Sequence, residues 1–334
     1  MPKTTRNNDR KFHISMALNI IQAVTIAALA FALLVVISSS SQQKPSASGN
    51  VPASNASVET LSNIGQPLNS SELSVINNAP DSYFEEAGQM LLNQSLTNYI
   101  SVGKNPQYAP FIVNGKPSVI YVGAISCVYC GENRWAMALA LSRFGSFTQL
   151  FKGYSSLGDH DVRTLYWNAD NYNAIGASFG NFYQSKYINF ISAEYDSPID
   201  LSLQIQTPAW FASQATNVTY KDAMLFMNST GKFGGTPFTF WGTSLVGGAD
   251  ASIFGNSIPS GNSLPISNWT HAQILSQLSS FNDQFAWSEY AAADVYAAQV
   301  CPALQDSNTI PVCGLPAIKT LEGLMNLTAA NQSA

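Results

Sequence analysis

The longest apolar stretch of the chain lies near its start. No Asp, Glu, Lys or Arg occurs between Lys11 and Lys44, and residues 14–37 are almost wholly apolar. At about 1.5 Å per residue, a helix of this length can cross a bilayer core of about 30 Å. We therefore predict one N-terminal transmembrane helix over residues 12–37.

Basic residues cluster on the N-terminal side of this stretch, where four of them stand against one acid. The positive-inside rule then keeps residues 1–11 in the cytoplasm and sends the rest of the chain outside. A cleaved signal peptide is the competing interpretation, but the apolar stretch exceeds the usual signal core of about 7 to 15 residues. The expected location is the cell membrane, with an uncleaved signal-anchor, a single pass and the C-terminal domain outside.

Residues 38–80 have hardly any aromatic or periodic apolar content. They are rich in Ser, Asn, Pro, Gln and Ala, a composition typical of a flexible tether. We predict a flexible linker over residues 38–80 and a folded extracytoplasmic domain over residues 81–334.

Helix and strand patterns begin at the start of this domain. Ser82 and Glu85 have the spacing of a capping box, and the apolar positions after them predict a helix that ends near Gly103. Residues 118–125 form a continuous β-rich apolar run, which indicates a buried central strand. Helical spacing over residues 131–144 follows.

The rest of the domain alternates short strands and helices, without an internal repeat. We predict strands over residues 162–167 and 187–195, an aromatic hairpin over residues 234–248, and helices over residues 208–215, 221–227, 268–281, 284–300 and 317–327.

Composition narrows the classes of function. Charged residues make up 10% of the chain and its net charge is -5, without a basic run beyond the N-terminus, so nucleic acid is excluded as a partner.

Eight glycosylation sequons weakly support the outward placement and predict a glycoprotein; they begin at Asn55, Asn69, Asn93, Asn217, Asn228, Asn268, Asn326 and Asn331. Outside the cell, disulfide chemistry is the expected use of the four cysteines.

The first two cysteines form a C-x-x-C motif between the predicted central strand and its helix. At a helix start, the sulfur of Cys127 would face the unpaired N–H groups and the positive end of the helix, which favours the thiolate. The same spacing also occurs in metal knuckles and structural bridges, so the motif alone leaves these uses open. The preceding strand favours a redox dithiol.

The order of these elements resembles that of the thioredoxin fold. In that superfamily a cis proline precedes an aromatic hairpin and lies against the dithiol, and Thr236-Pro237 occupies this place in the chain. The resemblance implies a thioredoxin-like α/β fold with C-terminal helices. Because 109 residues separate Cys127 from Thr236, it also implies an insertion between the C-x-x-C helix and the cis-Pro hairpin.

A second resemblance covers most of the predicted domain. The chain is similar to a mainly archaeal, membrane-anchored family called domain of unknown function 929 over residues 121–145, and more loosely over residues 187–194, 236–238, 292–294, Cys301 and Cys313. Members often carry proline after the first cysteine, whereas this chain has Val128, so a redox potential is not carried over.

Together these features predict a thiol-disulfide oxidoreductase or isomerase that acts on cysteines of exported proteins. Cys127 would attack, Cys130 would be the more buried, resolving thiol, and Pro237 would position the client backbone. Val128, Tyr129 and Thr236 are the candidates for client contact. No cofactor or metal is expected, and a membrane electron-transfer partner would restore the dithiol.

The four cysteines also allow other uses. Cys301 and Cys313 are predicted to form a structural bridge, with a second redox relay as the alternative. A Cys₄ zinc site and a copper-thiolate chaperone are disfavoured by spacing and by the lack of a fitting histidine. Glu132 would either accept protons during exchange or, as favoured, interact with the helix dipole. A non-catalytic surface binding protein with two permanent bridges is the rival function.

Overall fold

The structure is a computed structural model that describes residues 63–93, 107–155, 162–167, 176–178, 182–195, 206–247 and 269–325. The predicted cytoplasmic segment and transmembrane helix, residues 1–37, lie outside the described residues. Among the helices that are described, none is both long enough and apolar enough to cross a membrane.

One mixed sheet forms the centre of the fold. The described strands of the whole fold are β1 (Ile112–Val113), β2 (Lys116–Ala124), β3 (Ser146–Phe147), β4 (Phe151–Tyr154), β5 (Arg163–Tyr166), β6 (Gly176–Ser178), β7 (Tyr183–Gln184), β8 (Asn189–Tyr195), β9 (Phe238–Trp241) and β10 (Ser244–Gly247). Strands β3 and β7 form one separate two-stranded sheet, and β4 and β5 form another. In the central sheet the order is β10-β9-β2-β8-β6, and β1 pairs with the start of β2. Strand β8 runs parallel to β2, whereas β9 runs antiparallel to it, so β2 lies in the middle of the sheet.

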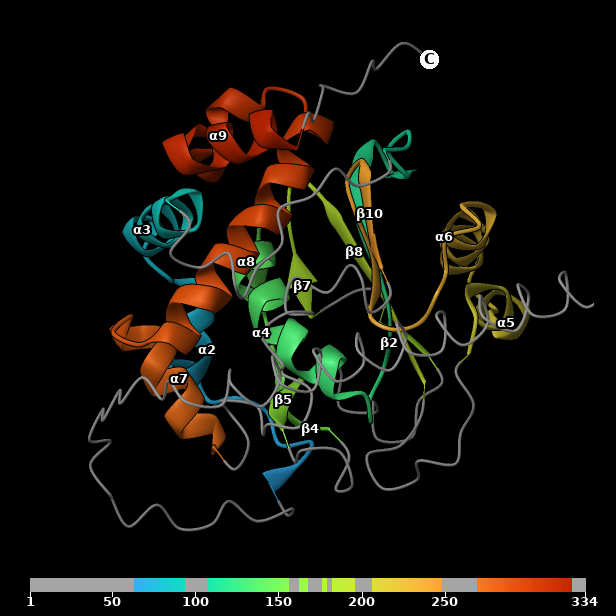
Figure 1. Cartoon of the computed structure of the whole chain (residues 1–334). Helices are drawn as coiled ribbons and strands as arrows, with labels where there is room; N and C mark the ends of the chain where they lie inside the picture. Colours follow the sequence, from blue (N-terminus) through green and yellow to red (C-terminus); the bar gives the residue numbers. More distant parts are fainter. Residues whose placement is uncertain are drawn as a thin grey trace, which may run out of the picture. The chain divides into compact units, whose positions relative to one another are not determined.

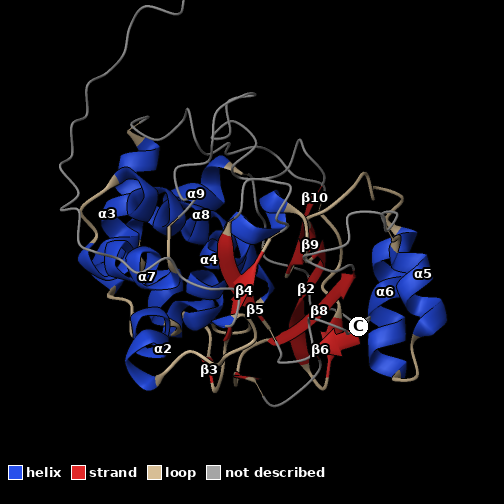
Figure 2. Cartoon of the chain, turned by 90° about the horizontal axis from the view of Figure 1, so that it is seen from below, coloured by secondary structure: helices blue, strands red, loops and turns tan. Residues whose placement is uncertain are grey.

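Helices cover both faces of this sheet. They are α2 (Ser70–Asn77), α3 (Asp81–Leu92), α4 (Val128–Ser142), α5 (Pro208–Gln214), α6 (Val218–Ser229), α7 (His271–Ser280), α8 (Gln284–Val300) and α9 (Pro316–Leu324), with short 3₁₀ turns between α8 and α9. Helices α4 and α8 lie on one face and α5 and α6 on the other, with α2, α3, α7 and α9 packed outside α4 and α8 (Figures 1 and 2).

The alternation of side chains along β2 separates two cores. Val119 and Tyr121 point into the core that contains α4 and α8, while Ile120 and Val122 point into the core that contains α5 and α6. All four are fully buried, as expected for a central strand covered on both faces. The apolar run 118–125 is therefore a buried strand, as predicted.

The first described helix lies earlier in the chain than the predicted folded domain. Helix α2 lies within the predicted linker and begins with a capping box between Asn69 and Glu72, while Leu68 and Ile76 are buried in the core. The predicted boundary at residue 81 is corrected accordingly. The sequence did not predict this helix because its few apolar residues lie in a Ser-rich segment whose overall composition is typical of a linker.

Helix α3 also differs from the prediction at both ends. It begins at Asp81 after Pro80, so Ser82 is inside the helix and is not its cap, and it ends at Leu92, well before Gly103. Glu85 instead accepts a hydrogen bond from the backbone N–H of Ala317 at the start of α9, at 3.1 Å. The apparent capping box is therefore a tertiary contact.

Cys301 and Cys313 form the predicted disulfide, across a sequence separation of 12 residues. The bond joins the end of α8 to the 3₁₀ turn before α9. Since the two sulfurs bind each other, they are not ligands of a Cys₄ zinc site with the C-x-x-C pair.

Removing this disulfide is expected to destabilise the domain. Closing a loop of this length restricts the unfolded chain, and the Cys301→Ala/Cys313→Ala variant should lose roughly 3 kcal/mol in the free energy of unfolding. Urea unfolding measures the loss. Wild-type protein incubated with a strong reductant should lose a similar amount, and an unchanged midpoint in both samples would contradict the structural role.

Candidate active site

Cys127 lies where the central strand ends and α4 begins. It is the N-cap of α4, with extended backbone, and its Sγ accepts a hydrogen bond from the backbone N–H of Cys130 at 3.4 Å. Its own N–H donates to the carbonyl of Ala124 at 3.3 Å, which ties the motif to the end of β2. The strand and the helix together therefore hold the sulfur over the helix N-terminus.

The surroundings of Cys127 favour its thiolate. The thiol of Cys130 is the largest influence, and together with the backbone N–H of Cys130, the contact with Thr236 and the charge of Arg134 it lowers the pKa of Cys127 to about 7, against the opposing effect of burial. The side chain remains partly exposed. A large fraction of Cys127 is therefore thiolate at neutral pH and accessible to a partner.

Cys130 has the opposite character. Its thiol is free, as that of Cys127 is, but its side chain is fully buried, which confirms the prediction that it is the more buried of the two. Burial, followed by the hydrogen bond and the charge of Cys127, raises the pKa of Cys130 well above its usual value. The pair thus combines one accessible, acidic thiol with one buried thiol that keeps its proton.

The loop before β9 lies against the dithiol. The Thr236-Pro237 peptide bond is cis, as predicted, and the carbonyl oxygen of Thr236 lies 3.8 Å from the Sγ of Cys127, which donates to it. Pro237 is buried and Thr236 is partly exposed. The pairing of β9 with β2 brings this loop to Cys127 across 109 residues of sequence.

The two residues between the cysteines point in different directions. Tyr129 is exposed, with 37% of its surface accessible, so its ring faces solvent. Val128 is 3% exposed and packs in the core with α4 and α8. Its side chain therefore does not face a client, contrary to its prediction as a contact residue.

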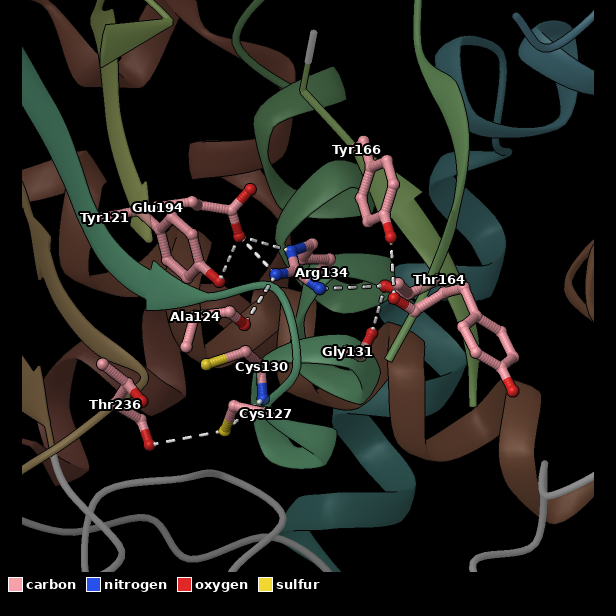
Figure 3. Close-up of polar contacts among 11 residues, drawn as sticks. Tyr121, Ala124, Cys127, Cys130, Gly131, Arg134, Thr164, Tyr166, Glu194 and Thr236 are labelled. Carbon is pink, nitrogen blue, oxygen red and sulfur yellow. Dashed lines mark hydrogen bonds and ion pairs between the residues drawn. The ribbon is translucent and has the colours of Figure 1, made fainter. Parts of the chain in front are cut away.

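A buried ion pair lies directly behind the dithiol (Figure 3). Arg134, one helical turn beyond Cys130, is fully buried and pairs with Glu194 on β8. Tyr121 on β2 donates its hydroxyl to the same carboxylate at 2.9 Å, and Arg134 Nη2 donates to the carbonyl of Ala124 at 3.0 Å. The charged group is therefore enclosed by the two central strands and α4.

The hairpin of β4 and β5 extends this network. Thr164 on β5 donates its hydroxyl to the carbonyl of Gly131 at 2.6 Å and accepts from Arg134 Nη1 at 3.5 Å. The backbone carbonyl of Thr164 lies 2.7 Å from Nε2 of the buried His271. The β4–β5 hairpin thus contacts the first turn of α4.

Glu132 is not the first-turn carboxylate that the sequence favoured, because α4 begins at Val128 and Glu132 lies beyond its first turn. It is 4% exposed, its Oε2 has no hydrogen-bond partner among the residues that the structure describes, and burial raises its pKa to about 8. Glu289 on α8 is 1% exposed, and burial together with the charge of Glu132 raises its pKa well above its usual value. Two buried carboxyls with raised pKa values therefore lie in the core between α4 and α8.

The sequence did not predict that four further residues belong to the site, namely Arg134, Glu194, Tyr121 and Thr164. Two signals were present: a charged residue four positions after Cys130, on the same helix face, and a carboxylate inside an otherwise apolar strand. The pairing of these two residues could not be predicted from the sequence, because 60 residues separate Arg134 from Glu194.

The fold and site define an α/β domain with a C-x-x-C motif at the start of a buried helix beside a cis-proline loop. The family described as Domain of unknown function (DUF929) matches residues 104–207 of the chain, which confirms the predicted resemblance to this family. The matched segment runs from before β1 to just before α5 and contains both cysteines, Arg134 and Glu194. No curated protein and no solved structure matches the chain.

Proposed function

We propose that this protein is a membrane-anchored extracytoplasmic thiol-disulfide oxidoreductase with a thioredoxin-like fold. The fold proposal is supported by the strand order β10-β9-β2-β8, by α4 connecting the parallel pair β2 and β8 as part of the crossover, and by the cis-proline before β9. In this view β3 to β7, α5 and α6 belong to the insertion.

One observation carries the proposed activity. A partly exposed Cys127 with a lowered pKa is paired with a buried Cys130 with a raised pKa, beside the cis Thr236-Pro237 loop. This division suits an attacking thiolate and a resolving thiol. The bonded Cys301–Cys313 pair, by contrast, suits a structural role.

The exchange is written first in the reducing direction. The Cys127 thiolate attacks one sulfur of a client disulfide, the client S–S bond breaks, and the other client sulfur leaves as a thiolate that takes a proton. Cys130, after losing its proton to solvent, then attacks Cys127 and releases the second client sulfur. The client disulfide gains two electrons, and the Cys127–Cys130 disulfide forms. Disulfide formation in a client is the reverse sequence.

The proposed clients are exported proteins with cysteines, reached from the outer side of the membrane. A dithiol or disulfide partner in the membrane, or a small thiol such as glutathione, would return the C-x-x-C pair to its starting state. Tyr129 offers clients an exposed aromatic ring, and the Thr236 backbone is placed to pair with an extended segment.

Trapping of a mixed disulfide tests the proposal. The Cys130→Ser variant keeps the attacking thiol but lacks the resolving one, so it should accumulate a covalent adduct with a disulfide-bonded protein such as insulin. Non-reducing electrophoresis detects the adduct, and wild-type protein should show little of it because Cys130 releases the client.

The matched control is the Cys127→Ser/Cys130→Ser variant, which should form no adduct. If Cys130→Ser forms none either, while the wild-type protein reacts slowly with alkylating reagents at both cysteines, the redox assignment is wrong. That outcome would favour the rival function, a surface binding protein without catalytic thiols.

A further inference from the structure

The buried guanidinium of Arg134 contacts each segment that holds the dithiol in place. Its Nη2 donates to the carbonyl of Ala124, the same oxygen that accepts the N–H of Cys127. Through the hydroxyl of Thr164 it is linked to the carbonyl of Gly131 in the first turn of α4. One side chain thus connects the end of β2 with the start of α4.

The charge of this side chain also acts on the two sulfurs. Arg134 lowers the pKa of both Cys127 and Cys130, although for each thiol it is a smaller influence than burial and the hydrogen bond between the cysteines. The ionisable groups that share the site are Glu194, which pairs with Arg134, and Tyr121, which donates to Glu194. Buried charges are screened little, so the balance between Arg134 and Glu194 reaches the sulfurs.

We infer that Arg134 is the positioning residue of the dithiol, and that its charge, balanced by Glu194, sets the equilibrium between the dithiol and the Cys127–Cys130 disulfide. The inference rests on the proposed function, because it concerns the redox pair of the same site. A cation behind the sulfurs stabilises the thiolate, which exists only in the reduced form. Arg134 therefore makes the disulfide a stronger oxidant, and Glu194 limits this effect.

The test replaces the whole network by apolar side chains of similar volume. In Tyr121→Phe/Arg134→Met/Glu194→Met the two backbone carbonyls described above keep a partner, because the N–H of Cys127 still donates to Ala124 and the hydroxyl of Thr164 still donates to Gly131. The pKa of Cys127, followed by thiolate absorbance, should rise by about one unit. The equilibrium with glutathione should shift about tenfold towards the disulfide, equivalent to about 30 mV.

A second variant separates charge from architecture. Glu194→Gln leaves Arg134 unbalanced, so the pKa of Cys127 should fall and the equilibrium should shift towards the dithiol, opposite to the apolar variant. The matched control, Asp81→Asn/Arg143→Met, removes another arginine–carboxylate pair at the far end of α4 and should leave both readouts unchanged.

Folding of each variant is checked by near-ultraviolet circular dichroism. If Glu194→Gln does not fold, the apolar variant decides alone: a change below about twofold in the glutathione equilibrium overturns the inference. If both variants fold and shift in the same direction, a structural effect explains them and the inference is also overturned. Neither readout uses a client protein, so a failure of client exchange would contradict the proposed function without affecting this result.

Discussion

Cys127→Ser is expected to lower the rate of disulfide exchange by at least about a thousandfold, because a hydroxyl does not ionise near neutral pH and is a poor nucleophile towards sulfur. The wild-type protein should react with iodoacetamide at Cys127, and the rate should rise with pH to a plateau through an apparent pKa of about 7. Mass spectrometry of the modified protein assigns the reacting cysteine.

Two substitutions of the buried cysteine sharpen this result. Since the thiol of Cys130 is the largest influence that lowers the pKa of Cys127, Cys130→Ala should move the alkylation profile to higher pH. Cys130→Ser keeps a hydrogen-bond donor and should move it less. Alkylation of Cys130 before Cys127 in the native protein would contradict the assigned roles.

Glu132→Gln is expected to make the protein less sensitive to alkaline pH. The unfolded chain releases this proton near its usual pKa of 4.5, whereas the folded protein keeps it up to a pKa of about 8. Between these values the folded state binds more protons, so stability from this group is complete below pH 4.5 and is lost as pH rises through 8. The free energy of unfolding falls by roughly 3 to 5 kcal/mol as Glu132 loses its proton, and the Glu132→Gln variant does not show this fall because glutamine does not ionise.

Urea unfolding at pH 5 and pH 9 measures this difference. The free energy of unfolding of the wild-type protein should fall relative to that of Glu132→Gln as pH rises, and Glu289→Gln should act in the same direction. Glu86→Gln, on the exposed side of α3, is the control for removal of one surface carboxylate. Parallel stabilities of wild type and Glu132→Gln at the two pH values would show that Glu132 is not buried as described.

The sequence predicted those parts of the fold whose signals are local. The apolar run of β2, the helix after it and the aromatic hairpin were each placed within a few residues, because continuous β-rich runs and helical spacing are properties of neighbouring residues. The greater burial of Cys130 followed from the same local context, since the sulfur of an N-cap residue and that of a residue one turn later differ in exposure on a buried helix.

What the sequence did not reveal depends on partners far away along the chain. Ser82 and Glu85 have the spacing of a cap, but Glu85 binds the backbone of Ala317, 232 residues later. Arg134 and Glu194 become a pair only when β8 aligns beside β2. Val128 has no sequence feature that separates it from Tyr129, and only the packing of α4 directs one inward and the other outward.

Helix α4 is buried along its whole length except at Tyr129. Its backbone amides are therefore enclosed on nearly all sides, and opening this helix would expose much of the main core. Regions of this kind open only at a free energy close to that of global unfolding. The two sulfurs consequently lie at the start of a helix that opens rarely, which would give the proposed thiol-disulfide exchange a preorganised support.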